Sequence, residues 1–116
     1  MEIIVTSDKL CCDVENIHNN HDDIIEGDLL SRISRFNFWE FKILNIEDID
    51  LKEFSTYKHL IEDYMEEIKK NPNYPPVIID DKSYSTPSIV DGTHRLNALD
   101  RLGYKQVRAF VPYIER

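Results

Sequence analysis

The residues best suited to chemistry form one uninterrupted segment, Asp91-Gly92-Thr93-His94-Arg95. Gly92 permits a sharp turn of the backbone, and Asp91 or Thr93 can cap a helix that begins there. The first amides of a helix have no partner within the helix and attract anions. The side chains of His94 and Arg95 add further donors beside these amides. The segment therefore predicts a phosphate-binding turn. An ordinary capped helix with a surface His-Arg pair would have the same residues.

The flanking residues predict a strand before this turn, and a helix and a second strand after it. Residues 88–90 are an apolar, β-branched run of the kind found in buried strands. Leucines recur with helical spacing between residues 96 and 102, and Gly103 suits the end of that helix. Apolar and polar residues then alternate over residues 107–111, as in a strand with one buried face.

The segment from Val90 to Arg95, followed by Ala98-Leu99, Leu102-Gly103-Tyr104 and Val107, resembles the signature of the ParB/sulfiredoxin superfamily. In that superfamily a G-x-H-R or G-E-R-R turn opens a helix and holds nucleotide phosphates. The free serine kinases, whose D-G-H-H-R segment differs at one position, are the nearest enzymatic type. The resemblance covers roughly residues 41–113. It implies a compact α+β domain with a small mixed sheet and packed helices.

Gly92, Thr93, His94 and Arg95 are therefore the expected phosphate-binding residues. The guanidinium of Arg95 can bind two phosphate oxygens at once, so Arg95 is the first expected ligand and His94 the second. We expect ATP, ADP or CTP as the nucleotide, together with Mg²⁺, and a small hydroxyl-bearing molecule as the acceptor of phosphate. No residue is assigned as a dedicated metal ligand.

A phosphotransferase also needs a carboxylate that activates the accepting hydroxyl. The resemblance to serine kinases assigns this role to Glu53, with Glu47 and Asp48 as competitors. Asp91 could hold the metal or orient His94, and we count Glu53, Asp91 and His94 as the candidate catalytic residues. Many acidic side chains of this chain are simply solvated, so each carboxylate has that alternative.

Sulfiredoxins have their reactive cysteine where this chain has Thr93. Repair of cysteine sulfinate is therefore not expected unless Cys11 or Cys12 replaces that nucleophile. These two cysteines are adjacent, so they do not predict a disulfide framework. With no second cysteine pair, they do not predict a zinc site either.

Length and charge limit the classes of function. A chain of 116 residues holds one domain, and its net charge of −8 repels the phosphate backbone of DNA. No apolar run is long enough to span a membrane, and no signal peptide is evident, so a cytoplasmic protein is expected. A cluster of basic residues near Arg95 inside an acidic chain suits one small anionic ligand.

Residues 1–36 have no counterpart in the superfamily pattern. We expect them to be an extension of a nucleotide-binding core that spans residues 37–116, serving as a lid, a partner-binding surface or a decoration. Residues 3–5 suggest a strand and residues 28–36 a short helix, whereas residues 6–27 are too polar for an assignment. Deleting the extension is expected to leave a folded core.

The rest of the chain predicts a strand at residues 39–43, an amphipathic helix at residues 57–68 and a hairpin whose first strand is residues 77–79. We expect one shared core formed by Ile61, Met65, Ile78, Ile89, Leu96, Leu99, Leu102, Val107 and Val111.

Three functions fit these observations. The first is an enzyme that transfers phosphate from a nucleotide or hydrolyses it. The second is a non-catalytic module that senses a nucleotide or binds a protein partner. The third is a ParB-type DNA-partition protein, which the acidic charge and the lack of a helix-turn-helix segment disfavour.

Overall fold

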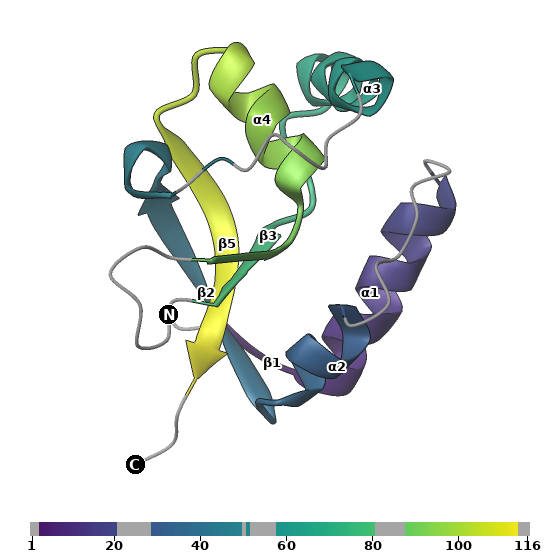
Figure 1. Ribbon diagram of the computed structural model, residues 1–116, viewed down its shortest axis with the longest axis vertical. Coiled ribbons are helices and arrows are strands. Elements are labelled where there is room, and N and C mark those ends of the chain that lie inside the picture. Colours follow the sequence, from purple (N-terminus) through teal and green to yellow (C-terminus); the bar gives the residue numbers. More distant parts are fainter. Residues whose placement is uncertain (1–2, 21–28, 50, 52–57, 81–87, 114–116) are drawn as a thin grey trace.

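The computed structural model describes residues 3–20, 29–49, 51, 58–80 and 88–113 (Figure 1). Its elements, in chain order, are β1 (Ile4–Thr6), α1 (Ser7–Asn20), α2 (Leu29–Ser34), β2 (Phe38–Asn45), the 3-10 helix η1 (Ile46–Asp48), α3 (Lys58–Lys70), β3 (Val77–Asp80), β4 (Ser88–Asp91), α4 (Thr93–Arg101) and β5 (Gln106–Tyr113). None of the described helices has the length and apolar content needed to cross a membrane.

The strands form one five-stranded sheet in the order β1-β2-β5-β3-β4. β1 pairs antiparallel with β2, β2 with β5, and β3 with β4, while β3 and β5 run parallel. The expected α+β architecture with a mixed sheet and packed helices is therefore confirmed. The expected hairpin is formed by β3 and β4, and its connection at residues 81–87 lies outside the described residues.

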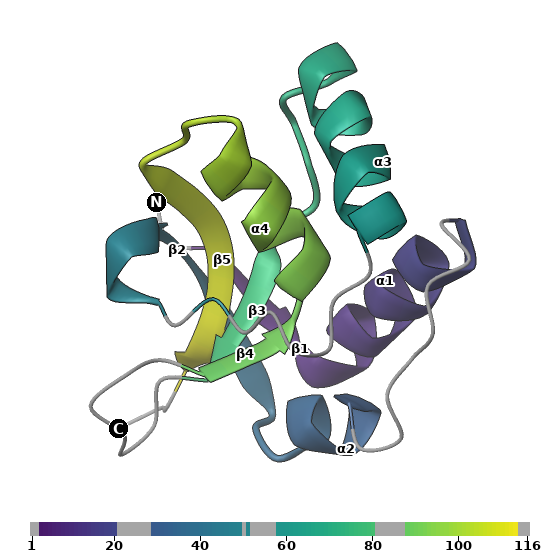
Figure 2. The same cartoon turned by 45° about the horizontal axis from the view of Figure 1, so that its top comes forward.

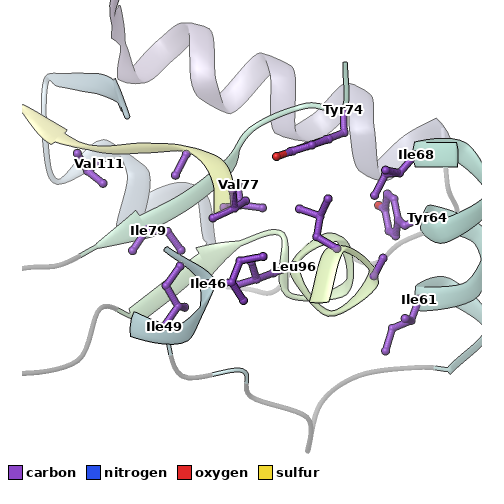
Figure 3. Packing of buried hydrophobic residues seen from close by; sticks show 14 residues of the cluster. Ile46, Ile49, Ile61, Tyr64, Ile68, Tyr74, Val77, Ile79, Leu96 and Val111 are labelled. Carbon is purple, nitrogen blue, oxygen red and sulfur yellow. The ribbon is translucent and has the colours of Figure 1, made fainter. Parts of the chain in front are cut away.

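One face of the sheet is covered by α4, which lies between the sheet and α3 (Figure 2). Ile61, Tyr64 and Ile68 of α3 are buried, which confirms the predicted apolar face of that helix. Tyr57, expected at its start, is outside the described residues. In Figure 3, the buried side chains of α3 lie in the larger core cluster together with Leu96 of α4 and Val77 of β3.

The opposite face of the sheet is covered by α1 and α2. Because successive strand residues point to opposite faces, Ile78 lies here while its neighbours Val77 and Ile79 belong to the larger cluster. The prediction of one shared core was thus wrong for Ile78. The other predicted core residues belong to the larger cluster: five are buried, and Met65, Ile89 and Leu102 pack against it partly buried.

Residues in the N-terminal third form much of this second cluster. Leu10 and Val14 of α1 and Leu29 and Ile33 of α2 are buried with Trp39, Ile78 and Val90. Trp39 is fully buried, and its indole Nε1 donates a hydrogen bond to the carbonyl oxygen of Ile33 over 3.1 Å. The short helix and strand predicted in this third are confirmed as α2 and β1, whereas α1 was not predicted.

Candidate functional site: the turn between β4 and α4

Gly92 joins the end of β4 to the start of α4 in a left-handed conformation, with φ 100° and ψ 22°. A Cβ at this position would lie 2.6 Å from Cγ1 of Val77 and 2.8 Å from Nη2 of Arg95. Glycine is therefore required here for two reasons: the backbone conformation is left-handed, and there is no space for a side chain.

The N-terminus of α4 presents backbone donors and has no side-chain cap. The amide of Leu96 donates to the carbonyl of Gly92 over 2.8 Å and closes the first helical turn. The preceding amides have no acceptor within the helix, and the helix dipole places partial positive charge beside them. Thr93 and His94 are partly exposed, so an anion can approach this end of the helix.

Behind the turn lies a buried charged cluster of His18, Asp91 and Arg95. Oδ1 of Asp91 is 2.8 Å from Nε2 of His18, and Oδ2 accepts a hydrogen bond from Nη2 of Arg95 over 3.0 Å. The carbonyl of Pro76 also lies 3.5 Å from Nη2 of Arg95. Both oxygens of the carboxylate are thus held by donors from different elements.

The electrostatics of Asp91 follow from these partners. Burial alone would raise the pKa of Asp91. The positive charge of Arg95, together with the hydrogen bond and charge of His18, outweighs burial and holds the pKa of Asp91 below its ordinary value. Asp91 is consequently ionised at neutral pH, and it is a weak base.

Arg95, the first expected phosphate ligand, does not reach outward into solvent. Its side chain is only 2% exposed, because it turns back over the glycine and pairs with Asp91. Two of its donors, Nε and Nη1, are buried and have no hydrogen-bond partner among the described residues. Buried donors without acceptors are energetically costly, so this guanidinium has unused capacity for an anion.

Known proteins resemble this chain in structure rather than in sequence. No protein-family model matches it. No curated protein matches it either. The crystal structure of sulfiredoxin from Arabidopsis thaliana superposes with a TM-score of 0.54 at 19% identity, covering 64% of this chain and 85% of that chain. This protein has a ParB/sulfiredoxin-like fold.

Two ParB structures show the same fold. A Pnob8-like ParB-N domain matches with a TM-score of 0.51 at 20% identity, covering 66% of this chain and 31% of that chain. The C-terminally truncated chromosome-partitioning protein ParB from Caulobacter crescentus, complexed with CTP-gamma-S, matches with a TM-score of 0.50 at 21% identity, covering 65% of this chain and 45% of that chain. The matched region therefore covers less than half of either ParB chain.

Of the carboxylates expected to face the turn, Glu47 lies away from it. Glu47 is exposed on η1 and lines an open hollow of about 440 Å³ with Asp100 and Tyr104, at the C-terminal end of α4. The Gly92 turn is at the other end of that helix. Asp48 is also exposed on η1, and Glu53 lies outside the described residues.

The described residues do not form a metal site. No group of three or more His, Cys, Asp or Glu side chains in the described part of the chain is arranged to hold a metal ion. Each oxygen of Asp91 already has a partner, His18 for Oδ1 and Arg95 for Oδ2. Sγ of Cys11 lies 3.9 Å from the Leu30 carbonyl and from Oγ of Ser34, so its side chain contacts α2. Cys12 is exposed.

His18 is the residue of the site that the sequence did not reveal. It is 7% exposed and lies 73 positions before Asp91 in the chain. A signal was present, because Leu10, Val14 and His18 recur at four-residue intervals on one face of α1. The polar composition around them hid this stripe.

Proposed function

We propose that this protein binds a nucleotide through its phosphates at the N-terminus of α4. The observation that carries the proposal is the turn itself, where a left-handed Gly92 exposes the first amides of a helix next to a strand. The fold supports it, because one ParB structure with this fold is a complex with CTP-gamma-S.

In this proposal the amides of the turn, Thr93 and His94 contact the phosphate directly. Arg95 acts from behind the turn, where Asp91 fixes the guanidinium through one nitrogen. Its Nε and Nη1 donors are buried without a partner, and in this proposal they turn towards phosphate oxygens that dock against the turn. Charge-assisted bonds of this kind are about twice as strong as bonds between neutral groups.

The chemistry we propose is transfer of phosphate to a small hydroxyl compound, or hydrolysis of the nucleotide. Glu53 is the proposed base. Asp91 is not suited to that role, since its pKa is lowered and both oxygens accept hydrogen bonds or ion pairs. Asp91 instead positions Arg95. Mg²⁺ would arrive with the nucleotide phosphates, since the described residues do not supply a site for it.

A non-catalytic nucleotide sensor is the second candidate. It is favoured by the contact between His18 of α1 and Asp91, the residue directly before the turn. A nucleotide that moved Asp91 would also act on α1, and through α1 on a surface that a partner protein could recognise.

Titration calorimetry with CTP, ATP and ADP, with and without Mg²⁺, tests the binding site. His94→Ala should weaken binding by about tenfold, the loss expected for one hydrogen bond to a charged group. His59→Ala removes an exposed histidine of α3 and is the matched control, which should bind like the wild type. If the wild type binds none of these nucleotides at millimolar concentration, the proposal is wrong.

Turnover separates the enzyme from the sensor. Glu53→Gln should abolish release or transfer of phosphate while leaving nucleotide affinity unchanged, if Glu53 is the base. Glu47→Gln is the matched control, because Glu47 is placed away from the turn. Binding without product in the wild type, across a panel of small hydroxyl compounds, would favour the sensor.

A further inference from the structure

A hollow of about 200 Å³ lies between α1 and the residues that lead into β3. Its walls include Leu10, Val14 and Ile17 of α1, together with Ile78 and Phe110 of the sheet. Leu10, Val14 and Ile78 are almost completely buried. One wall of the hollow is therefore formed by buried, apolar side chains.

The charged groups around this hollow are already compensated. Asp91 lines it, but both carboxylate oxygens of Asp91 are held by His18 and Arg95. Asp13 also lines it, and Oδ2 of Asp13 lies 2.8 Å from Nζ of Lys9. A charged ligand would lose its hydration without gaining a counter-charge. The hollow consequently favours an uncharged occupant.

We propose that this hollow binds a small, uncharged and mainly apolar molecule that has one hydroxyl group. An apolar cavity of about 150 Å³ is large enough for a benzene ring, so the space admits a ring or a branched chain of similar size. Asn16 is exposed and lines the same hollow, where its amide can donate or accept one hydrogen bond. This combination selects a neutral alcohol over a hydrocarbon.

The hollow adjoins the turn but is separate from the phosphate site. Asp91 precedes Gly92, and the carbonyl of Pro76, which also lines the hollow, lies 3.5 Å from Nη2 of Arg95. An occupant would touch residues that hold Arg95 without touching the amides of α4. The inference goes beyond nucleotide binding and stands or falls independently of it.

An NMR titration of the ¹⁵N-labelled full chain, without nucleotide, tests this site. Benzyl alcohol and cyclohexanol should give saturable shifts at the amides of Val14, Ile17, Ile78 and Phe110. Benzoate and benzylamine, which have similar size but carry charge, should bind at least about tenfold more weakly. No saturable shift with either alcohol, or equal binding of the charged probes, would overturn the proposal.

Variants locate the binding. Val14→Phe fills the hollow from its buried wall and should remove the benzyl alcohol shifts. If that variant does not fold, as judged from the dispersion of its spectrum, Ile17→Phe fills the hollow from its half-buried side. Glu15→Ala, at an exposed position on α1 between these two residues, is the control and should bind normally. Retention of wild-type affinity in the folded filling variant would show that the alcohols bind elsewhere.

Discussion

The face of the sheet under α3 and α4 and the face under α1 and α2 are filled differently. The first holds the larger cluster, built from aliphatic and aromatic side chains. The second holds a smaller apolar cluster around Trp39. Three of the four buried polar or charged side chains among the described residues, His18, Asp91 and Arg95, meet where α1 reaches the turn.

This difference shows how the N-terminal segment is joined to the candidate site. A buried ion pair is stable only while each charge keeps its partner. The stability of the larger cluster depends on close packing of its apolar side chains. The stability of the junction between α1 and the turn depends on Asp91 keeping its partners His18 and Arg95. The four predictions below test this contrast.

Deleting residues 1–36 should have the largest effect. The deletion uncovers Trp39, Ile78 and Val90, and exposing each large apolar side chain costs about 1.5–3 kcal/mol. The sum is comparable with the whole stability of an ordinary domain, which is about 5–15 kcal/mol. The packing therefore reverses our expectation from sequence, and we now expect the truncated chain to be unfolded by circular dichroism. A cooperative thermal transition in that chain would instead support an independent core.

Arg95→Ala should cost about 3–5 kcal/mol of unfolding free energy, because Asp91 would remain buried without its main counter-charge. Arg95→Lys should recover only part of this loss, since an ammonium cannot copy the planar guanidinium. Urea unfolding measures both variants. Arg101→Ala, an exposed arginine on the same helix, is the control and should change stability by less than about 0.5 kcal/mol. Equal stabilities of the Arg95→Ala and Arg101→Ala variants would contradict the role assigned to the buried pair.

Two matched leucines compare the apolar parts of the two faces. Leu99→Ala and Leu10→Ala remove the same atoms from buried positions, at a cost of about 2–5 kcal/mol. Leu99 should be near the upper end of this range, because it lies within the larger cluster. Leu10 should be near the lower end, because it already borders a hollow into which its surroundings can relax. A greater loss for Leu10→Ala would invert the comparison.

The smallest expected effect is on how steeply the free energy of unfolding falls at acidic pH. The pKa of Asp91 is lowered in the folded protein, so its contribution is fully present above its ordinary pKa of about 3.9 and is lost as the pH falls through the lowered value. Urea unfolding between about pH 2 and pH 5 should therefore show a shallower acid loss for Asp91→Asn than for the wild type. Asp100→Asn, at an exposed position, should keep the wild-type slope. An identical slope in the Asp91 variant would exclude this linkage.

Strong periodicity made most of the fold predictable. The apolar spacing within α3 and α4, and the alternation in β5, indicated those elements and their buried faces directly. Residues 7–20 have a low apolar content, so α1 could not be distinguished from a polar loop, although Leu10, Val14 and His18 share one face.

The chemistry of the turn was predicted in part. Gly92 and the helix that follows it were expected, because the glycine and the leucine spacing are local signals. The burial of Arg95 was not expected, although Asp91 and Arg95 are four residues apart, a spacing that often marks an ion pair. The third member of the cluster, His18, is 73 positions away from its partner Asp91 in the chain. A contact over that separation cannot be predicted from the residues around either position.

The position of β5 has a consequence for the order in which this molecule can be made. β5 is the last of the described strands in sequence order, yet it lies in the middle of the sheet, between β2 and β3. During synthesis on the ribosome, the β1-β2 pair and the β3-β4 hairpin have nothing to join them until residues 106–113 emerge. The nascent chain must therefore carry unpaired strand edges until residues 106–113 emerge, and such edges are open to aggregation and to recognition by chaperones.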